Sequence, residues 1–239
     1  ICHPSLANNE LSGPVVLTAV AKWLHEQDRR FTYRLVFIPE SIGALLYSSL
    51  NLRELQQHVV AGINLTCIGD DGDYSFLASR EGNSPIDRIG KRVVRTTPQP
   101  VEHSYLDRGS DERTYAAPGI DLPLISLMRT KYGKYRGYHS SLDDLELVTP
   151  SGLQGGLDLV RDTLRQLEES RYFLTTVRGE PQLGRRGLYH TMHARTVADE
   201  VLLRTHILAY SDGLHSTMDI AEMTGHDLEV IEALVDELH

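Results

Sequence analysis

The sequence predicts an α/β protein with a mainly parallel sheet, followed by a small all-α tail. Over the first 180 residues, apolar runs typical of buried strands alternate with helical patterns. This alternation predicts a parallel sheet with helices on both faces. Residues 180–187 are rich in Gly, Pro and charge, as is typical of a domain boundary. Three helical patterns follow, so we predict two domains, residues 1–180 and 187–239.

Local signals place the elements of the first domain. Ser12 and Pro14 are typical of a helix start, and residues 14–25 continue as an apolar helix. Residues 34–39 form an apolar run that we expect to be a buried strand ending at Glu40. The other predicted elements are helices at residues 41–50, 52–58, 84–95 and 149–172, and strands within residues 59–68 and 122–127.

The overall composition excludes several classes of protein. Of the 239 residues, 41% are hydrophobic and 24% are charged, which is typical of a soluble globular protein. No apolar run is long enough to cross a membrane, and no signal-peptide pattern is present, although a targeting segment upstream of Ile1 stays open. The net charge of −9 argues against a dedicated nucleic-acid binder. Cys2 and Cys67 are the only cysteines, so we expect no disulfide framework and a cytoplasmic location.

Four stretches carry side chains suited to a metal site. His3 follows Ile1 and Cys2, which are typical of the tail of a buried strand. Glu40 ends the next predicted strand, Asp70 lies in the loop after residues 59–68, and His139 follows an aromatic segment. Because the carboxyl ends of parallel strands meet at one edge of a sheet, we expect these side chains to converge.

A zinc site for hydrolysis needs about three N or O ligands, an open position for water and a carboxylate that takes the water's proton. His3, Glu40 and His139 are ligands of suitable types, and Asp143 could orient the imidazole of His139 or its loop. Taken singly, each residue also fits a structural role, Glu40 as a helix cap and either histidine as a hydrogen-bonded loop residue. Both interpretations stay open, because no compact ligand spacing is present.

Basic and aromatic residues alternate in residues 129–138. Such a segment can stack on nucleic acid, but the excess of acidic residues elsewhere favours the wall of a substrate pocket. In the tail, residues 224–226 have the length and the Gly of a helix-turn-helix turn. The last helical pattern, residues 227–238, carries five acidic residues and no Lys or Arg. Because phosphates would repel it, we expect it to contact protein or to form a dimer rather than to bind DNA.

Four motifs resemble those of a known family. They are residues 1–14 (ICHPSLANNELSGP), 37–40 (FIPE), 106–113 (LDRGSDER) and 138–144 (YHSSLDD). They resemble the aminopeptidase-like proteins encoded near polysaccharide-biosynthesis genes, a divergent branch of the co-catalytic di-zinc aminopeptidases, over nearly the whole chain. The resemblance implies a three-layer α/β/α zinc-peptidase fold of the phosphorylase/hydrolase-like type and a C-terminal winged helix. It also implies that an N-terminal part with a small inserted β-domain lies outside this chain.

Carried over residue by residue, the resemblance implies that His3 and His139 are terminal zinc ligands. Glu40 falls at a pair of Glu residues, of which one is the base and the next a ligand, but only one of the two is present here. Where the family has a metal-bridging Asp, this sequence has Asn9, and where the family has another zinc-binding Asp, it has Thr66. Both carboxylates are therefore missing here. Two adjacent divalent ions need these carboxylates to offset their repulsion. We therefore expect one zinc ion, held by His3, Glu40 and His139.

Other residues could complete this site. Glu10 and Asp70 lie close enough in sequence to replace the missing carboxylates. If Glu40 is a ligand, the base is Asp70 or Asp111. Arg108 could neutralise an oxyanion or a substrate carboxylate, and a structural ion pair with a neighbouring Asp is its alternative role.

These features lead to one expected function and two rivals. We expect a zinc-dependent metallopeptidase of aminopeptidase type, in which metal-activated water hydrolyses a peptide or amide bond of a peptide or aminoacyl small-molecule substrate. The first rival is a catalytically degenerate module that binds a metal or ligand. The second is a scaffold that acts through its helical tail, with a protein partner or a second copy. We expect no nucleic-acid or membrane partner.

Overall fold

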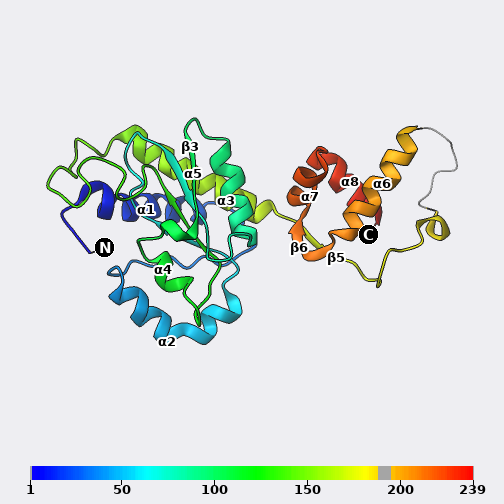
Figure 1. Ribbon diagram of the computed structural model, residues 1–239, viewed down its shortest axis with the longest axis horizontal. Coiled ribbons are helices and arrows are strands. Elements are labelled where there is room, and N and C mark those ends of the chain that lie inside the picture. Colours follow the sequence, from blue (N-terminus) through cyan, green and yellow to red (C-terminus); the bar gives the residue numbers. More distant parts are fainter. Residues whose placement is uncertain (1, 188–194, 239) are drawn as a thin grey trace. The chain divides into compact units, whose positions relative to one another are not determined.

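The computed structural model describes residues 2–187 and 195–238. The chain forms two compact units, residues 1–168 and 169–239, each of which is described by itself (Figure 1). The second unit therefore begins before the predicted boundary at residues 180–187. The reason is that β5 (Tyr172–Leu174) pairs with β6 (Asp212–Ser216), which ties the start of the tail to its later residues.

A four-stranded sheet forms the centre of the first unit, in the order β1-β4-β2-β3. Its strands are β1 (Gly62–Leu65), β2 (Tyr74–Leu77), β3 (Pro100–His103) and β4 (Leu124–Met128). β1 is parallel to β4 and β2 is parallel to β3, while β2 and β4 are antiparallel. The sheet is therefore mixed but mainly parallel, as the sequence predicts.

Helices cover this sheet. They are α1 (Ser12–His25), α2 (Ile42–His58), α3 (Pro85–Arg95), α4 (Glu112–Tyr115) and α5 (Pro150–Glu169). Apolar side chains of α1, α3 and α5 pack with those of the strands in one core. α4 packs on β4, and α2 packs on α4, at the lower edge of this unit in Figure 1. The predicted α/β class is confirmed.

Local signals determine where several helices begin. Ser84 accepts a hydrogen bond from the backbone N–H of Asp87, whose carboxylate bonds back to the N–H of Ser84. This capping box satisfies two N–H groups that have no partner within the helix, and Pro85 fits the first turn. A π-helical turn, Ala7–Leu11, leads directly into α1.

The strand predicted at residues 34–39 is not present. These residues form no helix and pair with no strand among the described residues, and the side chains of Leu35 and Phe37 are exposed. A strand needs a neighbouring backbone with which to exchange hydrogen bonds. Residues 34–38 and β1 line the same cavity but do not pair. Cys2, expected at a strand tail, also lies in no strand, and the same expectation for Ile1 falls outside the described residues.

The second unit is mainly helical, with a short two-stranded sheet. Its elements are β5, a 3-10 turn (Leu183–Arg186), α6 (Arg195–Ala209), β6, α7 (Thr217–Thr224) and α8 (Leu228–Leu238). Buried side chains of α6, α7 and α8 form a separate core. The expectation of an all-α tail is therefore wrong in one respect, since β5 and β6 form an antiparallel pair.

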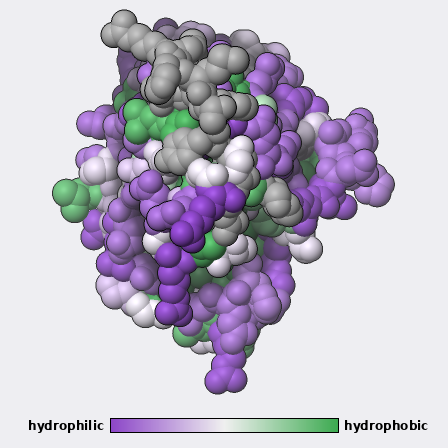
Figure 2. Space-filling view, turned by 90° about the vertical axis from the view of Figure 1, so that its right-hand side faces the viewer, coloured by the Kyte–Doolittle hydropathy of each residue, from purple (hydrophilic) through white to green (hydrophobic). Residues whose placement is uncertain are grey.

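The molecular surface fits the composition. The face seen in Figure 2 is largely hydrophilic, with apolar residues in scattered patches. Among the described residues, no helix combines the length and the apolarity that a membrane crossing needs.

Candidate functional site

Two histidines from opposite ends of the first unit lie side by side. The ring centroids of His3 and His139 are 4.3 Å apart. The ring of Tyr138 stacks on His139 with centroids 3.9 Å apart, and His139 has a left-handed backbone with φ of 55°. The structure therefore brings together both imidazoles that the sequence singles out.

Cys2, His3 and Glu10 form a group whose possible ligand atoms all lie within 4.8 Å of one another. His3 Nδ1 is 2.7 Å from Cys2 Sγ and 3.4 Å from Glu10 Oε1. The backbone N–H of Cys2 donates to Glu10 Oε2 at 2.7 Å. The side chain of Glu10 is 3% exposed, so this carboxylate lies at the bottom of the site.

Glu40 joins this group through the thiol of Cys2, which donates to Glu40 Oε2 at 3.0 Å. The turn after Glu40 sets its position. The N–H of Ile42 donates to the Glu40 carbonyl at 2.7 Å, and Ser41 has φ of 60° and ψ of −71°. Such a γ-turn is strained, by about 1–3 kcal/mol. Strain of this kind concentrates at functional sites, and here it lies beside a candidate residue.

Asp111 and Arg113 lie next to Glu40. Asp111 Oδ1 accepts the backbone N–H of Ser41 at 2.8 Å. Burial raises the pKa of Asp111, the bond from Ser41 opposes this effect, and the charge of Glu40 adds to it. Arg113 donates to Ser41 Oγ at 2.6 Å and lies 4.0 Å from Glu40 Oε1.

Asp70 does not join the site, which corrects its assignment as a candidate base or substitute ligand. Its Oδ1 accepts from the N–H of Gly72 at 2.8 Å and from Thr130 Oγ1 at 2.5 Å. Its Oδ2 accepts from Asn8 Nδ2 at 2.9 Å and from the N–H of Thr130 at 3.1 Å. Since four donors occupy both oxygens, Asp70 fastens loops together.

Arg108 makes its contacts with Tyr105. Its side chain is exposed, and its guanidinium lies 4.7 Å from the ring centroid of Tyr105 while donating to the Tyr105 carbonyl at 3.3 Å. Within the described residues it forms no ion pair with Asp107 or Asp111. Arg113, two residues after Asp111, is the cation near Glu40.

Asp143 holds the two loops of the site together rather than orienting an imidazole. Its carboxylate accepts the N–H groups of Asn8 and Asn9, at 2.6 and 3.1 Å, and the hydroxyl of Tyr135 at 2.8 Å. It is 2% exposed. The loop that carries His139 is thereby fixed to the turn that carries Glu10.

The basic and aromatic segment, residues 129–138, is largely built into the fold. Arg129 is buried and donates to the carbonyls of Gly72 and Asp73. Lys131 is buried against the ring of Tyr132. Of this segment, only the carboxyl end reaches the site, where the ring of Tyr138 stacks on that of His139.

The donors at this site fit a metal ion. Imidazole and carboxylate groups are the ligands that zinc takes in hydrolases. Asn9 adds an independent observation. The residue is only 8% exposed, and its buried Oδ1 has no hydrogen-bond partner among the described residues. Buried acceptors are rarely left without a partner, unless an ion or water supplies one.

The carboxylates govern protonation within the group. Burial raises the pKa of the Cys2 thiol to about 12, and the hydrogen bonds to Glu40 and Glu10 add to this effect. Burial opposes ionisation of Glu10, but the hydrogen bonds donated by Cys2 outweigh it and lower the pKa of Glu10. Glu10 is therefore ionised and Cys2 is a thiol at neutral pH.

The sequence points to Glu10 only as a substitute ligand, and it singles out neither Cys2 nor Arg113 for the site. Glu10 lies in a run of amide residues with nothing local to mark it as buried. Cys2 and Arg113 enter through contacts with Glu40 across 38 and 73 positions of the chain, which no spacing shows.

Comparisons with known proteins agree with this fold. The chain is 34% identical over its whole length to a Clostridium acetobutylicum protein named "putative polysaccharide biosynthesis protein with aminopeptidase-like domain", and spans 55% of that protein. The crystal structure of a "putative peptidase" from Clostridium acetobutylicum matches the whole chain with a TM-score of 0.76 at 32% identity, over 54% of its own length. The chain thus spans about half the length of these relatives.

More distant structures show the same fold over about two thirds of the chain. The match to a zinc aminopeptidase from Bacillus subtilis covers 67% of this chain and 42% of the aminopeptidase chain, with a TM-score of 0.56 at 18% identity. The match to an aminopeptidase from Aneurinibacillus sp. strain AM-1 covers 67% of this chain and 39% of the aminopeptidase chain, with a TM-score of 0.51 at 18% identity.

Two family descriptions divide the chain near the boundary between its two units. Residues 171–239 match a winged helix-turn-helix, which confirms the winged-helix tail. Residues 1–170, most of the chain, match the family described as domain of unknown function (DUF4910). The chain therefore belongs to the DUF4910 family and has the fold of the aminopeptidases, joined to a C-terminal winged helix.

Proposed function

We propose that this protein is a metal-dependent hydrolase of aminopeptidase type that cleaves a peptide or amide bond, with zinc as its metal. The observation that carries the proposal is the convergence of His3, His139, Glu10 and Glu40 beside the unpartnered Oδ1 of Asn9. The names of structural neighbours with this fold include zinc aminopeptidases, which supports the choice of metal.

The ligands proposed from this geometry are His3, His139 and Glu10, and Asn9 lies beside them, since its Nδ2 donates to Glu10 Oε1 at 3.1 Å. A bound zinc ion lowers the pKa of water and polarises a carbonyl. One ion is proposed rather than two. An amide stands at Asn9, and the hydroxyl of Thr66 donates to the Asn9 carbonyl at 3.0 Å, so neither position supplies the charge that would offset a second ion.

Glu40 is the proposed base. It reaches the group from the side of α2, and only the neutral thiol of Cys2 lies between it and Glu10. The guanidinium of Arg113 lies 4.0 Å from Glu40 Oε1 and places a positive charge beside the proposed base. Asp111 is the alternative base, since burial raises its pKa toward neutral pH, where a general base works best.

Elemental analysis combined with hydrolysis of an aminoacyl anilide tests this proposal. We expect about one zinc per chain, loss of the zinc in His139→Ala and Glu10→Gln, and zinc without turnover in Glu40→Gln. His58→Ala, at the exposed end of α2, is the matched control and should keep both properties. Two zinc ions per chain would contradict the single-ion site, and zinc without turnover in the unaltered chain would favour a degenerate module.

The setting of this activity is also a proposal. The name of the relative mentions polysaccharide biosynthesis, and we propose the same context here, with a peptide or aminoacyl substrate. We propose a cytoplasmic location because both cysteines are free in the structure.

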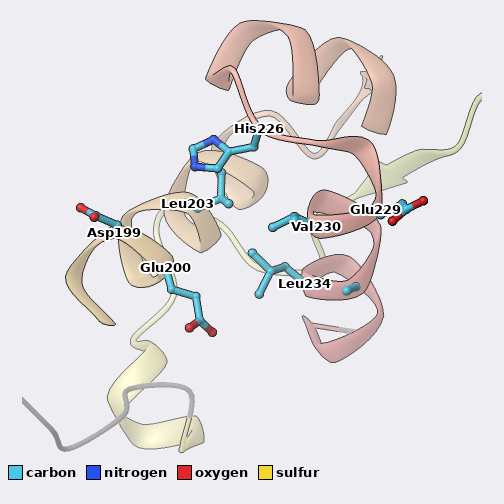
Figure 3. Close-up of a pocket in the computed structure, with 8 residues that line it drawn as sticks. Asp199, Glu200, Leu203, His226, Glu229, Val230 and Leu234 are labelled. Atoms are coloured by element: carbon cyan, nitrogen blue, oxygen red, sulfur yellow. The ribbon is translucent and has the colours of Figure 1, made fainter. Parts of the chain in front are cut away.

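A specific observation supports a second role, that of a scaffold acting through the winged helix. A cavity of about 470 Å³ lies between α6 and α8, and Figure 3 shows Val230 and Leu234 of α8 pointing toward Leu203 of α6 across it. Asp199, Glu200 and Glu229 also line it. An apolar floor with an acidic rim suits a protein contact rather than DNA.

Sedimentation of Val230→Glu tests this second role. If the groove joins two copies, the unaltered chain will self-associate as its concentration rises, and Val230→Glu will stay monomeric. Leu214→Glu, at an exposed position of β6 outside the groove, is the control. A monomeric unaltered chain would exclude self-association through this groove.

A further inference from the structure

Electron-rich atoms crowd around the sulfur of Cys2. The sulfur lies 2.7 Å from His3 Nδ1, 3.2 Å from Glu10 Oε1 and 3.0 Å from Glu40 Oε2. A thiol has one hydrogen to donate, an imidazole has at most one at Nδ1, and a carboxylate has none. Two hydrogens cannot serve every contact within this group, so at least one contact sets two lone pairs against each other. A bound cation would relieve that repulsion.

The spacing of three of these atoms fits a metal ion. Cys2 Sγ, His3 Nδ1 and Glu10 Oε1 form a triangle with edges of 2.7, 3.2 and 3.4 Å. In a tetrahedral zinc site with bonds of about 2.0–2.3 Å, the ligand atoms lie about 3.3–3.8 Å apart. Two edges of the triangle are close to this spacing, and the edge between sulfur and nitrogen needs to lengthen by about 1 Å or less.

The amide of Asn9 is a second, independent sign of a cation at this place. Its Nδ2 donates to Glu10 Oε1 at 3.1 Å, so the amide lies against the carboxylate of the triangle. Its buried Oδ1 lacks a hydrogen-bond partner among the described residues. A buried acceptor without a donor is costly, and a neighbouring ion or water would remove that cost.

Burial gives the triangle an inner and an outer side. The side chain of Glu10 is 3% exposed, whereas Cys2 is exposed. An ion that enters from solvent therefore reaches the sulfur before it reaches the carboxylate. The sulfur is accessible to an incoming metal, and Glu10 supplies the buried negative charge that holds the metal there.

We propose that Cys2 is a ligand of the metal, in addition to the His3, His139 and Glu10 of the proposed function, on which this inference rests. On binding, the S–H bond breaks, the sulfur keeps the electron pair that it shares with the metal, and the proton passes to solvent. A donor set of sulfur, nitrogen and oxygen suits Zn²⁺ or Cd²⁺ rather than Mg²⁺ or Mn²⁺. Because four protein ligands fill a tetrahedral site, this set belongs to the resting protein, and the sulfur is the ligand that gives way to water.

X-ray absorption at the zinc edge tests this ligand in the zinc-loaded chain. We expect a sulfur neighbour at about 2.3 Å, beside nitrogen and oxygen neighbours at about 2.0–2.1 Å. Cys2→Ser should lose the sulfur neighbour. Cys67→Ala, which removes the only other thiol of the chain, is the matched control and should keep it. Acetohydroxamate, which binds metals through two oxygens, should displace the sulfur from the unaltered chain.

A comparison of two metals separates a ligand from a residue that only supports the loop. Sulfur is a soft donor, which favours Cd²⁺ over Mn²⁺. Cys2→Ser should therefore weaken Cd²⁺ binding by more than about tenfold, since even residues that only orient a ligand have effects of that size. Mn²⁺ binding should change by less than about threefold. Equal weakening of both ions would mean that Cys2 only supports the loop, and would overturn the proposal.

The remaining outcomes distinguish this inference from the proposed function. Zinc with nitrogen and oxygen neighbours alone in the unaltered chain would exclude Cys2 as a ligand and leave the proposed zinc site standing. A sulfur neighbour that persists in Cys2→Ser would also exclude it. A chain that takes up no zinc would overturn the proposed zinc site, and this ligand with it. A sulfur neighbour that stays when acetohydroxamate binds would contradict the resting form.

Discussion

The thiol of Cys2 lies 3.0 Å from the carboxylate of Glu40, although 38 positions separate the two residues in the chain. This contact brings the amino end of the chain to the strained turn at Ser41. It also places a thiol between two carboxylates, because Glu10 Oε1 lies 3.2 Å from the same sulfur. The reactivity of Cys2 therefore reports on the geometry of the candidate site.

Replacing Glu40 by Gln should make Cys2 more reactive. Burial raises the pKa of Cys2 to about 12, and the hydrogen bond and charge of Glu40 contribute to this shift. Each unit by which the substitution lowers this pKa increases the thiolate fraction about tenfold at pH 8. The rate of alkylation by iodoacetamide measures the change. Cys67, fully buried, should stay unlabelled, and an unchanged rate in Glu40→Gln would show that the contact is absent in solution.

Asp143→Asn should destabilise the first unit by about 2–3 kcal/mol, because a buried amide cannot accept all three bonds of the carboxylate. Asp143 accepts from Asn8, Asn9 and Tyr135 while only 2% exposed. Urea unfolding measures the loss. The neighbouring Asp144→Asn is the matched control, since Asp144 is exposed and accepts from Glu146. Equal losses in the two variants would contradict the bridging role.

Gly156→Ala should be destabilising, although Ala is normally the better helix former by about 1 kcal/mol. A Cβ at Gly156 would lie 2.4 Å from the carbonyl oxygen of Ile68 and 2.7 Å from Ile68 Cγ1. Because backbone must move to relieve this clash, we expect a loss of about 2 kcal/mol. Gln154→Ala, at an exposed position of the same helix, should be nearly neutral in urea unfolding. A stabilised Gly156→Ala would show that α5 packs less closely.

His103 should make the first unit less stable in mild acid. Burial lowers the pKa of His103 from its ordinary 6.5, and the charge of Lys131 adds to this effect. The unfolded chain then binds a proton more readily, so stability is full above about pH 6.5 and falls below it. His103→Gln should reduce the difference between urea midpoints at pH 7.5 and 5.5. His58→Gln, exposed, should not, and an unaltered pH dependence in His103→Gln would refute this role.

Helices and the site histidines could be predicted from sequence because their signals are local or strongly patterned. Ser12 and Pro14 mark the start of α1, and Ser84 and Pro85 mark that of α3. The structure also brings the rings of His3 and His139 together, with centroids 4.3 Å apart.

The remaining features depend on partners that are distant in the chain. The apolar run at residues 34–39 is typical of a strand, but a strand exists only where another backbone pairs with it. β2 and β3 are each four residues long, and α3 separates them in the sequence. No local signal therefore reveals that they pair with each other. Asp70 resembles a site carboxylate in sequence, yet the four donors around it come from three separate segments.

Arg113 rather than Arg108 should matter for hydrolysis, if the proposed function holds. Arg113 bonds to Ser41 and lies 4.0 Å from Glu40, so its removal should loosen the turn that positions the proposed base and remove the positive charge beside it. We expect Arg113→Ala to lower kcat/KM on an aminoacyl anilide about tenfold, and Arg113→Lys to restore part of it, as one weakened electrostatic contact implies. Arg108→Ala should stay within about twofold, because its guanidinium lies over the Tyr105 ring. A larger effect at Arg108 would reverse this assignment and show that substrate reaches the exposed turn at residues 105–108.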